Sequence, residues 1–547
     1  MSKSRSFSIF LLKQEYDASN ALKDDHSLEQ TVPATALPKN ASLFILDNAP
    51  KEPWWKSYFG VQMSLQQVTK GALIFLPVDT RVFALSFGHV AHNLKDVSYE
   101  PDFGLRVTLN CVDPAKIKNT DILEPCVSRR QRTQVSVDSN ITYFDFDRNS
   151  TILKSLTGKV KKEYQEIMRH ATGASSLRIS SAASSDELIR LCEKLLELYE
   201  SDEYKTTFPD IQNITPVRDP EIIKKLNETL LYAFVEKQIG ISLTIPEIIE
   251  YRDNIYTTFS GVGESRVYDG LSIEDYYNYI EFNGKDLATL GIEDLKKHTL
   301  YLTDENGFPR DSHSIFKSLI FECSTGDEDA TYHLIDGNWY KAENAYIDKL
   351  RAFLDPLCID LPYPDYLHED EGDYNKAFAA EKPAYLCFDK TDISPAGQTQ
   401  IEPCDLYHVR DSRAMLIHVK RSTLSAQLSH LFNQGANAVE LLKLEKAAVE
   451  QILSLIDKAA GALAAPFKAP IEASNPAFEV VFGIVTGKDK SRRSANLPLF
   501  SRISLMRNIK ALQLMNAKAN FGFIPDKTPK TEGKKKPRKK AAAGDKE

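Results

Sequence analysis

A chain of 547 residues is too long to bury its apolar side chains around one hydrophobic core. Single cores stop growing at about 250–300 residues, so we expect two to four domains. Apolar residues make up 42% of the chain and charged residues 26%, as in ordinary globular proteins. Because strand-like and helix-like segments both recur along it, the sequence predicts a multidomain α/β protein of the α+β kind.

No uninterrupted apolar stretch approaches the roughly 18–20 residues that cross a bilayer. The first apolar run, residues 9–12, is closed by Lys13 and Glu15, which favours a strand over a secretory signal. The seven cysteines are scattered and contain no CxxC pair, so neither a disulfide framework nor a thiolate zinc site is indicated. We therefore expect a cytoplasmic protein with no membrane contact.

Candidate strands dominate residues 1–155, which are predicted to form an N-terminal α+β domain. They are rich in bulky β-branched and aromatic residues. The candidate strands are SFSIFLLK, ASLFILD, GALIFLPV, RVFALSFG, FGLRVTLN and NITYFDFD.

Helical spacing dominates residues 156–295, which are predicted to be mainly helical. The expected helices are SSDELIRLCEKLLELYES, with Ser185 or Asp186 as cap, DPEIIKKLNETLLYAFVEKQ and SIEDYYNYIEF. The segment FSGVGES lacks the GK[ST] ending of a phosphate-binding loop, and no strand clearly precedes it, so we expect an ordinary loop.

Strands return in residues 296–526, in HTLYLTD, SLIFECS and TYHLIDGNWYKA, and the last two together suggest a hairpin or meander. Residues 527–547 carry nine Lys/Arg against three Asp/Glu, a local charge of +6 in a chain of net −8. This tail has no apolar face and is expected to be disordered. It could gather polyanions, or it could act only as a solubilising tail.

The segment between residues 402 and 434 contains most of the candidate catalytic residues. It predicts strand, turn, strand and helix, with Asp405 near the start of the first strand and Lys420 at the end of the second. His418 lies two residues before Lys420 and should point to the same face. A carboxylate, a second ligand and a lysine on one face suit metal-assisted phosphodiester cleavage, and Gln434 on the following helix could complete the site.

Each of these residues also has a plain structural interpretation. An aspartate followed at some distance by a lysine is a very common pattern, and a lysine that closes a buried strand often only reaches solvent. A histidine cluster of His408, His418 and His430 is conceivable, although His430 lies on an apolar helix face and is more typical of packing.

The order helix, strand, Asp, hairpin, acid-x-Lys, helix resembles the PD-(D/E)xK restriction-endonuclease-like superfamily. The strings EGDYN, IEPCDL, IHVKR and LSHLFNQG resemble more closely a sporadically distributed bacterial family of about this length, found in mobile and phage-defence contexts. That resemblance runs from the first strands to LPLFSRISL. It implies a restriction-endonuclease-like α/β core in residues 296–526, with Asp405 as strand acid, Lys420 as strand lysine, Glu371 as helix acid and Gln434 as the downstream helix residue.

The sequence departs from the superfamily pattern at His418, where that pattern has Asp or Glu. The resemblance implies Mg²⁺ held by Asp405, Glu371 and the residue at 418, and imidazole suits Mn²⁺ better than Mg²⁺. Three alternatives stay open: His418 binds the metal, Glu402 or Glu371 supplies the missing charge, or the site is inactive.

A basic loop, GKDKSRRS, lies between a predicted strand, FEVVFGIV, and LPLFSRISL. Beside a nuclease core it could hold a phosphate backbone, and charge pattern alone equally allows a solvated hairpin tip. The candidate nucleic-acid-binding residues are Arg421, Lys488, Lys490, Arg492 and Arg493.

Three functions follow from these patterns. The first is a divalent-metal-dependent nuclease in antiphage defence, with DNA rather than RNA as the expected partner, in a homo-oligomer or with a defence-system protein. The second is a sensor or adaptor that binds nucleic acid and has lost catalysis, as His418 would suggest. The third is a structural assembly protein.

Overall fold

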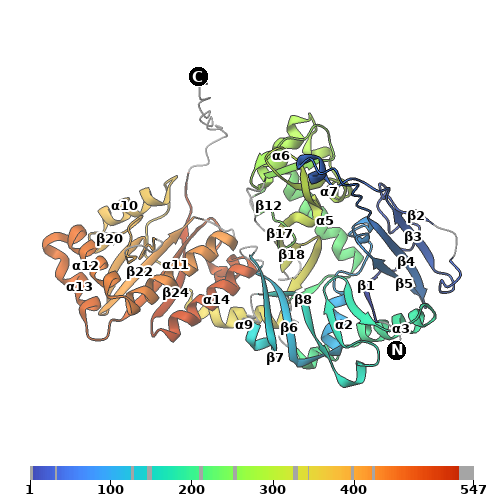
Figure 1. The fold of residues 1–547 in the computed structure, drawn as a ribbon. Coiled ribbons are helices and arrows are strands. Elements are labelled where there is room, and N and C mark those ends of the chain that lie inside the picture. The colour runs from blue at the N-terminus through green and yellow to red at the C-terminus, as the bar shows by residue number, and fades with distance from the viewer. Residues whose placement is uncertain are drawn as a thin grey trace. The chain divides into compact units, whose positions relative to one another are not determined.

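The computed structural model describes residues 4–30, 34–124, 129–144, 151–208, 214–238, 240–249, 256–324, 331–342, 344–395, 400–421 and 425–528. The chain divides into two units, Met1–Tyr346 and Ile347–Glu547 (Figure 1). The expected boundaries at 155/156 and 295/296 both fall inside the first unit. In the part of the chain that the structure describes, no helix has the length and apolar character needed to cross a membrane.

An antiparallel sheet, the N-terminal sheet, begins the first unit, with strand order β2-β3-β4-β5-β1-β10-β9-β8-β6-β7. Its strands are β1 (Arg5–Leu11), β2 (Glu29–Gln30), β3 (Ser42–Asp47), β4 (Lys70–Val78), β5 (Arg81–Phe87), β6 (Val112–Glu124), β7 (Arg129–Ser139), β8 (Ile152–Val160), β9 (His170–Gly173) and β10 (Leu177–Ser181). The strand predictions for SFSIFLLK, ASLFILD, GALIFLPV and RVFALSFG are confirmed. The sheet continues beyond residue 155 to Ser181.

The prediction of a strand in FGLRVTLN is wrong, because this segment forms helix α2 (Phe103–Cys111). Its apolar residues alternate, but Phe103, Val107 and Cys111 also lie four apart, and all three are fully buried. Gly104 lets this helix approach the sheet closely, since a Cβ there would lie 2.0 Å from the carbonyl oxygen of Ser176. The burial of this four-residue spacing, and not the alternation, therefore determines that the segment is a helix.

The strand predicted in NITYFDFD is also wrong where it is described. Ile141–Phe144 forms the 3₁₀ turn η2, and residues 145–147 lie outside the described part. Helix α3 (Leu188–Glu200) confirms the first predicted helix, and its buried leucines join the core of the N-terminal sheet. Its cap differs from the expectation, because Ser184 forms a capping box with Glu187. Short helices α1 (Trp54–Tyr58) and α4 (Tyr204–Thr207) complete this part.

Two further antiparallel sheets complete the first unit. The meander sheet has the order β11-β19-β18-β17-β12, and the hairpin sheet has the order β14-β13-β15-β16. Their strands are β11 (Ile214–Pro216), β12 (Ser242–Leu243), β13 (Tyr256–Ser260), β14 (Tyr268–Asp269), β15 (Thr299–Thr303), β16 (Pro309–Ser314), β17 (Leu319–Ser324), β18 (Thr331–Ile335) and β19 (Asn338–Ala342). The helices are α5 (Pro220–Val235), α6 (Ile273–Phe282), α7 (Ile292–Lys297) and α8 (Ile315–Ser318).

These elements confirm the predicted meander and the predicted helices α5 and α6, which begin at the caps Asp219 and Ser272. The expectation that no strand precedes FSGVGES is wrong, since β13 ends at Ser260 inside that segment. Because β14 follows the glycines where a phosphate-binding loop would have a helix, the segment remains a loop. Helix α9 (Asn344–Leu354) leads out of the meander sheet.

The second unit is a mixed sheet, the C-terminal sheet, with helices on both faces (Figure 1). Its strands lie in chain order: β20 (Tyr385–Cys387), β21 (Leu406–Arg410), β22 (Arg413–Lys420), β23 (Phe478–Thr486) and β24 (Lys518–Pro525). Neighbours from β20 to β22 are antiparallel, and neighbours from β22 to β24 are parallel. Its helices are α10 (Glu371–Glu381), α11 (Ser425–Leu444), α12 (Lys446–Ala460), α13 (Ala464–Glu472) and α14 (Leu499–Leu514).

The two faces of the C-terminal sheet have different cover. On one face Tyr374 and Phe378 of α10 pack against Ile417 and Val419. On the other face α11 contacts β22 and β23, and a Cβ on Gly435 would lie 2.7 Å from the ring of Phe482. The mixed α/β class is thus observed, and the predicted strand-turn-strand of residues 405–420 is confirmed, with Asp411 and Ser412 in the left-handed turn.

The basic tail begins later than predicted. The backbone N–H of Lys527 donates to the carbonyl of Tyr366 at 2.9 Å, and the hydroxyl of Thr528 donates to Asp526 at 2.6 Å. Both residues therefore belong to the folded unit. The rest of the predicted tail, residues 529–547, lies outside the described residues.

Candidate functional site

The carboxyl ends of β20, β22, β23 and β24 meet at one edge of the C-terminal sheet. Since β20 and β22 both run antiparallel to β21, their ends share this edge with the start of β21. Asp389 comes two residues after β20, Asp405 directly precedes β21, and Lys420 closes β22. This edge, where parallel strands end, is the usual place for a ligand site in α/β sheets.

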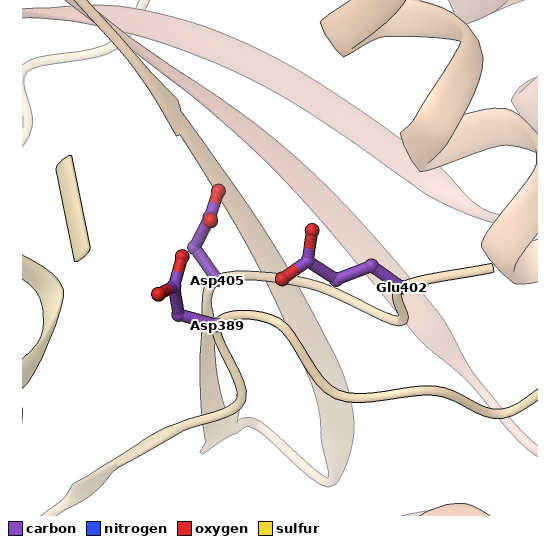
Figure 2. Close-up of side chains that lie close together, drawn as sticks. All are labelled: Asp389, Glu402 and Asp405. Carbon is purple, nitrogen blue, oxygen red and sulfur yellow. The ribbon is translucent and has the colours of Figure 1, made fainter. Parts of the chain in front are cut away.

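A group of carboxylates lies at this edge (Figure 2). Among the residues that the structure describes, Asp389, Glu402 and Asp405 each offer a carboxylate oxygen, and these oxygens lie within 4.8 Å of one another. Asp405 accepts a hydrogen bond from the backbone N–H of Val419 at 2.6 Å, and Glu402 accepts one from the backbone N–H of Lys390. Backbone donors therefore fix two of these side chains.

Two of these carboxylates, Asp405 and Glu402, have a raised proton affinity. Burial raises the pKa of Asp405 to about 8, and the neighbouring charges of Glu402, Asp389 and Glu371 add to this, against the lowering effect of the Val419 N–H. Burial also raises the pKa of Glu402. A group of acids held this close favours either a proton or a cation among them.

Buried oxygen acceptors surround the same group. Asn375 of α10 is fully buried, and its amide donates to Asp405 at 3.3 Å. Among the described residues, Asn375 Oδ1 and Asp389 Oδ2 are buried and have no hydrogen-bond donor. Carboxylate and amide oxygens are the ligands that Mg²⁺, Mn²⁺ and Ca²⁺ prefer. The residues present therefore fit a hard divalent cation.

A glycine on α10 permits this arrangement. A Cβ at Gly372 would lie 2.7 Å from Asp389 Oδ2, closer than two such atoms normally approach. Helix α10 begins at Asp370, whose side chain accepts from the Gly372 N–H at 2.9 Å. The first turn of the helix can therefore lie directly against Asp389.

Lys420 and Glu371 form an ion pair beside the carboxylates. The Lys420 ammonium lies 2.7 Å from Glu371 Oε2, and Glu371 Oε1 accepts from the backbone N–H of Arg421 at 2.8 Å. Glu371 lies in the first turn of α10, where a carboxylate is favoured by the helix dipole. The structure thus brings Asp405, Lys420 and Glu371 to one edge, with Glu371 bound to the lysine.

His418 lies away from this group. It is only 2% exposed, its ring centre is 6.0 Å from that of Phe482, and Phe482 packs against Phe432 of α11. Burial lowers the pKa of His418 to about 3, so the imidazole is neutral. The cluster of three acids at the sheet edge contains Glu402, and it does not contain His418. Gln434 is half-buried on α11, beside Gly435.

The candidate cations for nucleic acid differ in their surroundings. Arg421 is bound to Asp526 at 2.9 Å and lies over the ring of Tyr366. The basic loop follows β23 and forms the 3₁₀ segment η9 (Lys490–Asn496). Because β22 and β23 are parallel, this loop leaves the same sheet edge as Lys420, one strand away. Lys488, Arg492 and Arg493 are exposed, and Lys490 is half-buried.

Asp389 and Asn375 were missed in the sequence. Asp389 is separated from Asp405 by a long connection, and Asn375 ends the string EGDYN, in which only Glu371 was singled out. One signal was available for Asp389, because it closes the short apolar run AYLCFD, where an acid would lie at a strand end.

A family model, described as a family of unknown function (DUF6119), matches residues 7–525. The chain belongs to the DUF6119 family. The match covers both units, so the carboxylate edge and the N-terminal sheet are parts of one family architecture. Comparison of this DUF6119 chain with curated proteins and with solved structures finds no match.

Proposed function

We propose that the carboxylate edge of the C-terminal sheet is a divalent-metal-dependent phosphodiesterase site that cleaves nucleic acid. The observation that carries this proposal is the grouping of Asp389, Glu402 and Asp405 within 4.8 Å, directly beside the lysine that closes β22. An acidic group alone would suit many cations, and a lysine at the same strand end adds a partner for a phosphate oxygen or an attacking water.

Asp389, Glu402 and Asp405 would hold the cation, with the unpartnered oxygen of Asn375 beside them. When bound, Mg²⁺ or Mn²⁺ supplies Lewis acidity toward a phosphate oxygen and lowers the pKa of coordinated water. Glu371 fixes the Lys420 ammonium next to this group, at the sheet edge where the phosphodiester would lie. Lys420 then orients the attacking water and offsets charge on the phosphate.

The exposed cations of the basic loop support a nucleic-acid substrate. Arg492 and Arg493 are exposed beyond the end of β23, next to the strand that carries Lys420, and the Lys488 ammonium donates to the carbonyl of Asn496 at 3.1 Å within the same loop. Contacts of this kind hold a phosphate backbone without reading its sequence. The restriction-endonuclease-like core and the antiphage role rest on the resemblance of the sequence strings and belong to the same proposal.

The full-length protein, incubated with plasmid DNA and with RNA in Mg²⁺, Mn²⁺ or EDTA, provides the test. We expect metal-dependent cleavage that Asp405→Asn and Lys420→Met each reduce by about 100-fold or more. Asp411→Asn is the matched control, because Asp411 lies in the exposed turn of the same hairpin at φ 50°, a conformation that asparagine tolerates. Equal cleavage by the Asp405→Asn protein would exclude this site.

A second function, binding without cleavage, is favoured by one observation. The position two residues before Lys420 holds a buried neutral histidine where the superfamily pattern has an acid. Salt-dependent binding of DNA or RNA, with no cleavage in either metal, would support this sensor or adaptor function.

A further inference from the structure

A large cavity lies within the first unit and belongs to no site described above. Its volume is about 1010 Å³, and all its lining residues fall between Tyr16 and Tyr340. Packed protein interiors leave few voids larger than a water molecule, and small-molecule sites span about 300–1,000 Å³. A cavity of this size is therefore large enough for a ligand.

The cavity lining is positive in a negative chain. The described residues that line it include ten lysines and arginines and eight aspartates and glutamates, an excess of two positive charges. The whole chain has 68 basic and 76 acidic residues. Some lining charges pair with one another, such as Asp121 with Arg132 at 2.7 and 2.8 Å, and these pairs leave the positive excess unchanged. The remaining field favours an anion.

One buried carboxylate holds two of the cations. Asp336, in the turn between β18 and β19, has a side chain that is only 8% exposed. It binds the Arg130 guanidinium and the Lys154 ammonium, the latter at 2.8 Å. Lys154 also reaches the hydroxyl of Tyr340 at 3.3 Å. A single carboxylate between two cations leaves one net positive charge fixed in a poorly solvated place, where an anion is bound strongly.

Another wall of the cavity offers hydroxyl groups and a ring. Thr299 and Tyr301 of β15 pair with Ser314 and Ser312 of β16, and all four line the cavity. Leu300, between the two residues of β15, is buried in the core, whereas His313, between the two serines of β16, also lines the cavity. Hydroxyls suit the sugar of a nucleotide, and a tyrosine ring suits stacking on a base.

We propose that this cavity binds a nucleoside phosphate, with the phosphate at Arg130 and Lys154 and the nucleoside along the β15–β16 face. A free nucleotide and the end of a nucleic-acid single strand both carry a nucleoside phosphate, so either could be the ligand. The binding does not depend on the carboxylates of the second unit, so it can hold or fail independently of the proposed nuclease function.

The test is calorimetric titration of the full-length protein in EDTA with ATP, AMP, inorganic phosphate and a short single-stranded oligonucleotide. We expect saturable binding of the nucleotides or the oligonucleotide, and weaker binding of phosphate. Tighter binding of the oligonucleotide than of AMP would identify the end of a single strand as the ligand. Tighter binding of AMP would identify a free nucleotide.

Lys154→Met should weaken this binding by about tenfold, the loss of one charge-assisted contact. Lys159→Met is the matched control on the same strand, because Lys159 is bound to Asp138 at 3.0 Å and does not line the cavity. Arg178→Gln, an exposed lining residue of β10, should also weaken binding and carries little risk to folding. Asp405→Asn should bind as the unmodified protein does.

Absence of saturable binding for every probe would overturn the proposal. Equal affinity for phosphate and nucleotides would also overturn it, since the nucleoside would then make no contact. Unchanged affinity in both Lys154→Met and Arg178→Gln, with folding verified by circular dichroism, would show that any binding occurs elsewhere.

Discussion

Asp405 accepts a hydrogen bond from the backbone N–H of Val419 at 2.6 Å, so a carboxylate at the start of β21 is fixed directly beside the lysine that ends β22. The backbone of one strand thus positions the acid of its neighbour. A single well-placed donor does not offset the burial and the neighbouring carboxylates, and the pKa of Asp405 stays raised to about 8.

The raised pKa predicts a pH-dependent stability. The folded protein keeps a proton on Asp405 that the unfolded chain releases near 3.8, so stability falls as pH rises from that value to about 8. Asp405→Asn removes this dependence because the amide stays neutral. Urea denaturation across this range should show the unmodified protein losing at most about 1.4 kcal/mol per pH unit relative to the variant. Parallel curves would contradict the raised pKa.

The same proton predicts how metal binding depends on pH. A divalent cation must displace the proton from Asp405, so its apparent affinity should increase as pH rises toward about 8. Mn²⁺ at a fixed concentration should therefore raise the melting temperature more at about pH 8 than at about pH 6. Asp389→Asn should lose this shift, and Asp411→Asn should retain it. An equal shift in both variants would place the cation elsewhere.

Much of the C-terminal sheet could be predicted from the sequence, because its strands are short apolar runs bounded by turns. The AMLIHVK strand is buried along nearly its whole length, and Asp411 and Ser412 form the expected turn. The carboxylate group was only partly predictable. Asp405 and Glu402 lie close in sequence, whereas Asp389 joins them through the pairing of β20 with β21, which periodicity does not determine.

The N-terminal sheet shows a different limit. Strand β7 is mostly polar and exposed, with the sequence RRQRTQVSVDS, so it lacks the apolar alternation that identifies a half-buried strand. FGLRVTLN satisfied that alternation and is nevertheless a helix. Its close contact at Gly104 depends on β9 and β10, which follow far along the chain. Tertiary packing decided both cases.

Gly372→Ala tests the close contact of α10. Alanine favours a helix over glycine by about 1 kcal/mol, but its Cβ would lie 2.7 Å from Asp389 Oδ2. We expect a shifted carboxylate, weaker Mn²⁺ binding and lower cleavage, with the fold retained. Gly487→Ala is the control, because a Cβ there meets no atom within 4 Å. Unchanged metal binding in Gly372→Ala would show that the contact is unimportant.

Deletion of residues 529–547 should leave the melting temperature within about 2 °C of the full-length value, because this stretch offers no apolar surface to bury. A deletion that also removes Lys527 and Thr528 breaks their hydrogen bonds to Tyr366 and Asp526, and it should lower stability measurably. Equal melting temperatures for both truncations would show that these bonds contribute nothing. A large loss from the shorter deletion would show that the tail docks.

His418 provides the sharpest distinction between packing and metal binding. Its imidazole is neutral and lies among Phe482 and the apolar face of α11, and among the described residues its Nε2 has no hydrogen-bond partner. His418→Asp would bury an unpaired charge, so we expect a loss of about 2–5 kcal/mol in the free energy of unfolding and no gain in Mg²⁺-dependent cleavage. His418→Phe should be tolerated, and the variant should keep the Mn²⁺-dependent shift in melting temperature. The reason is that Glu402, and not residue 418, completes the cluster with Asp389 and Asp405. If His418→Asp instead folds normally and cleaves faster in Mg²⁺, then residue 418 reaches the metal and the cation lies on the other side of β22 from Glu402.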